Sequence, residues 1–132
     1  IHSFDNSFFG LSDHEASIMW PNQRKVLEVG YEVLFRAGFS SSTVKGQNIL
    51  VYLGDCGAEW WSILLDRFVS GEQIHCRKSD WEAAKSMAIT SARLSYQLGM
   101  TGPTWLCDTA CSSGLTAFCT AMYSIKRPTE RG

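Results

Sequence analysis

Hydrophobic residues recur at helical spacing in five stretches of this chain and form short uninterrupted apolar runs in two others. In the first helical stretch, Ser12 and Glu15 have the spacing of a capping box, so a short helix is expected to begin at Asp13. This helix is expected to end at Trp20-Pro21, because the residue before a proline is pushed out of helical conformation. The pattern therefore predicts a break there and a second helix directly after it.

The second predicted helix has Pro21 in its first turn and ends before Gly38, a residue suited to the left-handed position that follows a helix. Its apolar stripe consists of Val26, Leu27, Val33, Leu34 and Ala37. Its polar residues are expected to form a solvated face. The alternative for Gln23 and Arg24 is that they help to order a dimer or catalytic surface.

The next two elements are an apolar strand and a helix. The run Asn48–Gly54 has the length of a strand and is expected to be buried on both faces in a parallel sheet. A helix from Ala58 to Phe68 is expected to follow. Its adjacent Trp60 and Trp61 are predicted to pack in the core or at an interface, and the alternative is a substrate wall.

Residues 70–78 are predicted to form a surface loop. His75 and Cys76 are neighbours in it, but adjacent side chains seldom face each other as a catalytic pair, so a surface role is expected for both. His2 and His14 are also expected on the surface. Ser79 and Glu82 repeat the capping-box spacing, and a helix is predicted from Asp80 to Gly99. Its apolar side consists of Trp81, Ala84, Ala88 and Leu94.

The last part of the chain combines a buried strand with a cysteine. Gly102-Pro103 marks a turn, Trp105–Cys107 is predicted to be a strand, and Cys111 follows a few residues later. The last predicted helix comes directly after Cys111, and its apolar side consists of Leu115, Ala117, Phe118, Ala121 and Met122. The order of helices and strands predicts an α/β sandwich with a largely parallel sheet.

Cys111 is the main candidate for chemistry because it is predicted to lie at a strand-to-helix junction. A thiol there faces unpaired backbone N–H groups and the positive end of the helix dipole, and both favour the thiolate. The same N–H groups could bind an oxyanion. Cys107 and Cys119 are instead expected to be small buried hydrophobes.

Composition and charge narrow the class of protein. The chain has 132 residues, of which 45% are hydrophobic and 19% charged, and its formal net charge is −1. These values are ordinary for a globular domain and give no indication of a nucleic-acid or membrane surface. The five cysteines include no CxxC pair, so neither a disulfide framework nor a metal site is expected. A reducing compartment, the cytoplasm, is the expected location, with an organelle as the alternative.

Three separated blocks of sequence resemble one known family. The segment DTACSSGL at Asp108 to Leu115 resembles the active-site motif of β-ketoacyl synthases, the condensing domains of polyketide and fatty acid synthases. The segments from Phe4 to Gly38 and from Ser91 to Pro103 are similar to the blocks that precede that motif. The resemblance implies a thiolase-like layered α/β sandwich. It also implies that residues 1–132 are the N-terminal part of a single β-ketoacyl synthase domain.

The activity implied by this resemblance is a decarboxylative Claisen condensation. Cys111 would be the nucleophile that takes an acyl group as a thioester, and its backbone N–H would be an oxyanion donor. Acyl carrier protein would present the acyl and malonyl-type thioesters on phosphopantetheine, and no cofactor would bind this chain directly. The full-length protein is expected to be a homodimer, with no nucleic acid partner and no membrane span.

Some positions depart from the family pattern. WPNQR stands where DPQQR is usual, GDCGAEW replaces a segment that more often ends in Asp-Tyr, Ala92 replaces Gly, and Gly114 stands where Ser is frequent. The family also uses two histidines downstream of the nucleophile, whereas all three histidines of this chain precede Cys111. The piece alone is therefore expected not to condense acyl chains.

Two alternatives belong to other functional classes. One is a non-elongating scaffold that dimerises and binds carrier protein without condensing, and the intact Cys111 argues against it. The other is a redox-active thiol protein that pairs Cys111 with Cys107 or Cys119, although no CxxC motif supports it.

Overall fold

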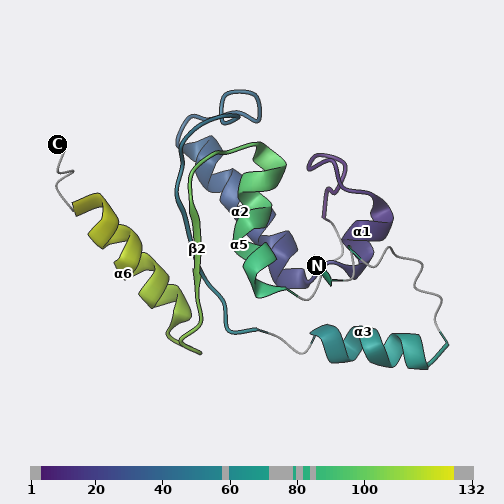
Figure 1. Cartoon of the computed structure of the whole chain (residues 1–132). Helices are drawn as coiled ribbons and strands as arrows, with labels where there is room; N and C mark the ends of the chain where they lie inside the picture. The colour runs from purple at the N-terminus through teal and green to yellow at the C-terminus, as the bar shows by residue number, and fades with distance from the viewer. Residues whose placement is uncertain (1–3, 58–59, 72–78, 80–81, 84–85, 127–132) are drawn as a thin grey trace.

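Two parallel strands lie between helices in the computed structural model, which describes residues 4–57, 60–71, 79, 82–83 and 86–126 (Figure 1). The elements in chain order are α1 (Asp13–Ile18), α2 (Pro21–Arg36), β1 (Val51–Gly54), α3 (Trp60–Val69), α5 (Met87–Leu98), β2 (Thr104–Cys107) and α6 (Ser113–Lys126). Helices α2 and α5 pack together on one side of the strands, and α6 covers the other side (Figure 1). The predicted α/β sandwich with parallel strands is confirmed.

Strand β1 is shorter and less buried than the sequence predicted. It pairs in parallel with β2 from Val51 opposite Thr104 to Gly54 opposite Cys107, and all four of its residues are half-buried. The prediction that the strand starts at Asn48 and is buried on both faces was wrong. The first ladder bond runs from the Val51 N–H to the Pro103 carbonyl at 3.1 Å. Because Pro103 has no N–H, it cannot donate a further hydrogen bond to the residues before Val51, and the strand pairing begins at Val51.

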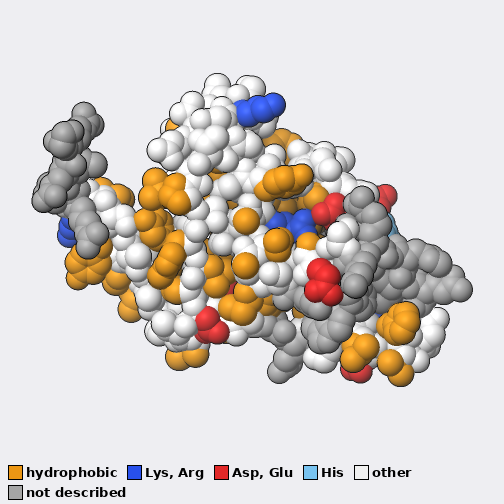
Figure 2. Space-filling view, in the orientation of Figure 1, with side chains coloured by type: hydrophobic (Ala, Val, Ile, Leu, Met, Phe, Trp, Pro, Cys, Tyr) orange, Lys and Arg blue, Asp and Glu red, His pale blue; other side chains and the backbone are white. Residues whose placement is uncertain are grey.

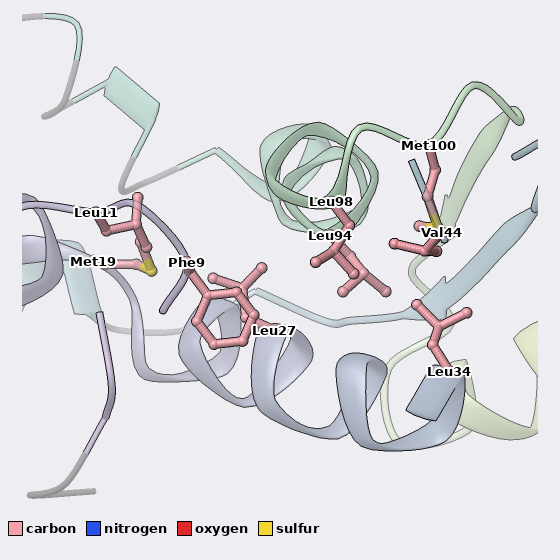
Figure 3. Packing of buried hydrophobic residues seen from close by; sticks show 9 residues of the cluster. All are labelled: Phe9, Leu11, Met19, Leu27, Leu34, Val44, Leu94, Leu98 and Met100. Carbon is pink, nitrogen blue, oxygen red and sulfur yellow. The ribbon is translucent and has the colours of Figure 1, made fainter. Parts of the chain in front are cut away.

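The hydrophobic core lies between the N-terminal segment, α2 and α5 (Figure 3). The nine buried residues of this cluster are Phe9, Leu11, Met19, Leu27, Leu34, Val44, Leu94, Leu98 and Met100. The two helices cross closely at Gly30, where an added Cβ would lie 2.5 Å from a methyl carbon of Leu94. The predicted stripe of α2 is therefore right for Leu27 and Leu34 and wrong for Val33, which is exposed.

Gln23 was predicted to lie on a solvated face, and this prediction was wrong. The alternative, that it helps to order a dimer or catalytic surface, stays a prediction. Its side chain is completely buried, because α5 packs over that side of α2. Its amide nitrogen donates to the Ala83 carbonyl at 3.1 Å and to the Thr90 hydroxyl at 3.3 Å. Its amide oxygen accepts from Nε of Arg93 at 3.0 Å, and Nη1 of Arg93 donates to Glu15 at 2.9 Å. This buried network joins α1, α2 and α5.

The Arg24 side chain contacts the end of α1 and a residue of α3. Its guanidinium donates to the Met19 carbonyl at 3.1 Å and lies 6.0 Å from the centre of the Trp60 ring. Burial lowers the pKa of Arg24, and the nearby Glu28 carboxylate opposes that shift. The Trp60 indole donates to the Ile18 carbonyl at 2.9 Å. These contacts pack α3 against the junction of α1 and α2, as expected for Trp60 in a packing role.

Several predicted helix ends are confirmed. The Ser12 hydroxyl accepts a hydrogen bond from the Glu15 N–H at 3.1 Å and caps α1. After α2, Gly38 has φ of +92°, its N–H donates to the Phe35 carbonyl, and the Phe39 N–H donates to the Leu34 carbonyl. This pair of bonds is a Schellman motif.

The helix predicted from Asp80 to Gly99 is not continuous. Ser86 has extended backbone angles, and α5 begins after it at Met87. Gly99 ends α5 with φ of +67°, as predicted. Asp80, Trp81 and Ala84 lie outside the described residues, as does most of the predicted loop, including His75 and Cys76. Within the described part of the chain, no helix is long and apolar enough to cross a membrane.

The apolar side predicted for α6 is largely exposed. Leu115 is 68% and Phe118 62% exposed, and Cys119, predicted to be buried, is exposed as well. Only Ser113 and Ala117 of this helix are buried, since β1 and β2 cover one narrow stripe of it. Trp105 on the outer strand β2 is 39% exposed. Figure 2 shows hydrophobic side chains along the part of the molecule that β2 and α6 form.

We expect Gln23→Ala to lower the free energy of unfolding by about 1–3 kcal/mol, because it leaves the buried Nε of Arg93 without its acceptor and removes the donor to the Thr90 hydroxyl. Urea unfolding measures the change. Lys25→Ala is the matched control on the same helix, since it removes only an exposed ion pair with Glu28, worth less than about 1 kcal/mol. Equal losses in the two variants would contradict the role assigned to Gln23.

We expect the 132-residue chain by itself to associate or aggregate. The outer edge of β2 has no partner strand among the described residues, so its backbone groups are unpaired there. The exposed apolar residues of α6 add hydrophobic surface beside it. Size-exclusion chromatography measures the outcome. A sharp monomer peak across a range of concentrations would show that this surface does not drive association.

Candidate active site

Cys111 lies in a sharp turn between the end of β2 and the start of α6. The residue before it, Ala110, has φ of +52° and is the only described residue other than glycine with a positive φ. A left-handed conformation costs an alanine roughly 1–2 kcal/mol, so neighbouring interactions must hold it in place. The turn leaves the Cys111 side chain exposed. The predicted strand-to-helix junction at Cys111 is confirmed.

Side chains of the motif itself hold the left-handed turn. Oδ1 of Asp108 accepts a hydrogen bond from the Ala110 N–H at 2.9 Å. The buried Ser113 hydroxyl donates to the Ala110 carbonyl at 2.6 Å and accepts from the Thr109 N–H at 2.8 Å. The Ser112 hydroxyl donates to the Thr109 carbonyl at 2.7 Å. Each such bond contributes about 1 kcal/mol, enough together to offset the strain at Ala110.

The first turn of α6 extends this network. The hydroxyls of Thr109 and Thr116 are 3.1 Å apart, and Thr116 Oγ1 also donates to the Ser112 carbonyl at 3.1 Å. The hydrogen bonds of Ser112 and Ser113 were not predicted from the sequence. The signal was present, since short polar side chains at a helix start commonly bond to nearby backbone.

The backbone around Cys111 leaves a donor available. Within the described residues, the Cys111 N–H has no hydrogen-bond acceptor, whereas the neighbouring N–H groups of Ser112 and Ser113 donate to Thr109 and Ala110. Cys111 also lies two residues before α6, at the positive end of the helix dipole. The arrangement combines an exposed thiol with an unpaired N–H, the two elements that acyl transfer through a cysteine needs.

The other thiols have different surroundings. Sγ of Cys107 is half-buried and donates to the Ser113 carbonyl at 3.3 Å, so it belongs to the packing between β2 and α6. Cys56 and Cys119 are exposed. All four cysteines in the described part of the chain are free thiols, so no disulfide supports the redox alternative there. Cys76 lies outside the described residues.

The one histidine in the described part of the chain, His14, is not near this turn. His14 lies on α1, on the opposite side of the molecule from the start of α6 (Figure 1). It is half-buried, and Nε2 is buried without a partner, so the expected surface position was only partly right. His2 and His75 lie outside the described residues.

The parallel strands between helices and the cysteine turn after β2 define a layered α/β protein. Comparisons with known proteins specify its thiolase-like class and its family. Residues 1–129 match the family model of the β-ketoacyl synthase N-terminal domain. The chain therefore belongs to the β-ketoacyl synthase family, as predicted. It is 36% identical over 126 residues to the highly reducing polyketide synthase virA of Hypocrea virens, and 36% identical over 124 residues to the pikromycin polyketide synthase component PikAII of Streptomyces venezuelae.

Solved ketosynthases have the same fold. The ketosynthase from module 6 of the bacillaene synthase of Bacillus subtilis 168 superposes with a TM-score of 0.71 at 30% identity over 92% of this chain. An oxazolomycin ketosynthase domain of Streptomyces albus gives 0.74 at 28% identity over 94% of it. The chain spans 19% and 21% of those two structures. The alignment with virA covers 96% of this chain but 5% of virA, and the alignment with PikAII covers 94% of this chain but 3% of PikAII.

We expect Cys111 to be the most reactive thiol of the intact protein, because among the four described cysteines it alone combines exposure with an unpaired backbone donor and a helix N-terminus. Limited alkylation with iodoacetamide at neutral pH, followed by peptide mapping, measures the order of labelling. Cys56 and Cys119 serve as internal controls, since they are also exposed. Labelling of either before Cys111 would contradict the assignment.

Proposed function

We propose that this chain is the nucleophile-bearing N-terminal part of a polyketide ketosynthase, an acyltransferase that extends an acyl chain by decarboxylative Claisen condensation. The observation that carries the proposal is the exposed Cys111 thiol, held at a strained turn whose hydrogen bonds come from the motif itself. The relatives named above are polyketide synthases, which favours polyketide over fatty acid biosynthesis.

The proposed reaction begins at the sulfur of Cys111. Its thiolate attacks the carbonyl carbon of an incoming acyl thioester, and the negative charge moves to the carbonyl oxygen. The unpaired N–H of Cys111 is the donor that would stabilise this oxyanion. Collapse of the tetrahedral intermediate expels the carrier thiolate, which takes up a proton, and leaves the acyl group on Cys111.

The second half of the reaction returns the thiolate. A malonyl-type thioester loses carbon dioxide, and the electron pair of the broken bond forms a carbanion that attacks the acyl carbonyl on Cys111. The carbon–sulfur bond breaks, Cys111 leaves as thiolate, and the product is a β-ketoacyl thioester two carbons longer. The same N–H stabilises the oxyanion of this step, so one backbone donor serves both acyl transfers.

The proposed partners follow from this chemistry. Acyl carrier protein would present both thioesters on phosphopantetheine, which is thus part of the substrate. A homodimer is supported by the outer edge of β2, which has no partner strand among the described residues and carries the part-exposed Trp105. The free thiols fit a reducing compartment, the cytoplasm.

We expect Cys111→Ala in the full-length protein to abolish loading of a radiolabelled acyl chain, because none of the other described thiols lies at the start of a helix. The fold should persist, since Cys111 is exposed and makes no side-chain hydrogen bond within the described residues. Cys119→Ala, two turns further along, is the matched control and should load normally. Retained loading in Cys111→Ala would identify another nucleophile. Loading without condensation in the unaltered protein would favour the scaffold alternative.

A further inference from the structure

We propose that Gly54, the last residue of β1, is a positioning residue for the Cys111 thiol. The inference rests on the proposed function of Cys111 and adds a second element of the fold to that site. Because Gly54 has no side chain, the first turn of α6 lies directly on the backbone of β1. The position of that turn sets the geometry of the bend that carries the thiol.

The close approach is visible in the space around Gly54. A Cβ added there would lie 2.2 Å from the carbonyl carbon of Ser113, 2.3 Å from its oxygen and 2.5 Å from the nitrogen of Gly114. All three are backbone atoms at the start of α6, so no flexible side chain could move aside. The φ of Gly54 is not in the left-handed region, so lack of space is the reason for glycine there.

Ser113 connects this contact to Cys111. Its carbonyl accepts from Sγ of Cys107, the residue that pairs with Gly54 in the strand register. Its hydroxyl bonds to the Ala110 carbonyl and the Thr109 N–H. In the sequence, Cys111 and Ser112 are the two residues between Ala110 and Ser113. A shift of Ser113 away from β1 would therefore change the left-handed turn and the direction of the thiol.

The size of that shift decides its chemical effect. Ordinary van der Waals contact begins at 3.4 Å, so an added methyl group would push Ser113 outward by about 1 Å. A displacement of that size can reduce the rate of a positioned reaction by about 100-fold. We expect substrate binding to change little, because Gly54→Ala removes no side chain from the site.

The chain offers two matched glycine controls. An added Cβ at Gly102 would lie 2.1 Å from the Ile49 carbonyl oxygen, an equally severe clash with backbone. This contact lies before β1 and β2 begin, at the end of the strand pair opposite Gly54. Gly114 follows Ser113 directly, and nothing lies within 4 Å of its added Cβ.

The experiment compares Gly54→Ala, Gly102→Ala and Gly114→Ala in the full-length protein. Two rates are measured: alkylation of Cys111 by iodoacetamide across pH, and single-turnover acyl loading against thioester concentration. For Gly54→Ala we expect a changed pH profile of alkylation, and a maximal loading rate about 100-fold lower at an unchanged half-saturating concentration. Gly102→Ala should lower the melting temperature but leave both rates unchanged, and Gly114→Ala should match the unaltered protein.

A second pair of variants applies if Gly54→Ala does not fold. Ser113→Ala removes the hydroxyl that bonds to Thr109 and Ala110 without adding a clash, and should slow Cys111 alkylation and change its pH profile. Ser124→Ala is its control on the same helix, because it removes a hydroxyl that bonds to Tyr52 and Thr120, and should leave the profile unchanged.

Two results would overturn the proposal. One is an unchanged pH profile of Cys111 alkylation in folded Gly54→Ala or in Ser113→Ala. The other is an equal change in Gly102→Ala, which would make the effect one of general stability. Alkylation is read directly at Cys111 and needs no condensation. The proposed function fails separately, if Cys111→Ala still loads acyl chains.

Discussion

The parallel pairing of β1 with β2 is the constraint on which the rest of the structure depends. Parallel strands cannot be joined by a tight turn, so α3 and α5 lie in the connection between them. The pairing brings Gly54 beside Cys107, and α6 begins directly above these two residues. The start of α6 in turn fixes the bend at Ala110 and exposes Cys111. The reactive position is thus set by backbone packing between segments that are distant in sequence.

A buried polar network joins α1, α2 and α5 on one side of that sheet. Gln23, Arg93 and Glu15 come from three different helices, and the buried Gln23 and Arg93 side chains bond to each other and to the half-buried Glu15. Such a network adds specificity, since a helix that rotated or slid would leave buried donors without acceptors. Gly30 allows α2 and α5 to cross closely enough for these side chains to meet. These helices therefore combine close apolar packing with a small set of obligatory hydrogen bonds.

The exposed apolar residues fit the membership of the chain in the β-ketoacyl synthase family. Leu115, Phe118 and Trp105 are large and apolar, yet a single layer of elements cannot cover both faces of α6 and both edges of a two-stranded sheet. The solved ketosynthases are about five times longer than this chain, which spans 19% and 21% of two of them. The homodimer proposed above would cover the outer edge of β2.

The sequence by itself determined the local features. Capping residues and glycines predicted the start of α1 and the ends of α2 and α5, and the apolar patterns on either side of Cys111 predicted a strand-to-helix junction there. These features depend on interactions within a few residues. Only the tertiary structure decided which side of each helix is buried. Gln23 looked like a surface residue until α5 was seen to cover it, and Cys119 looked like a core residue although nothing described packs over it. Periodicity places residues on one side of a helix, but the partner that covers that side comes from elsewhere in the chain. The role of Gly54 could not be predicted from the sequence for the same reason, since glycine is needed there only because α6 packs against β1.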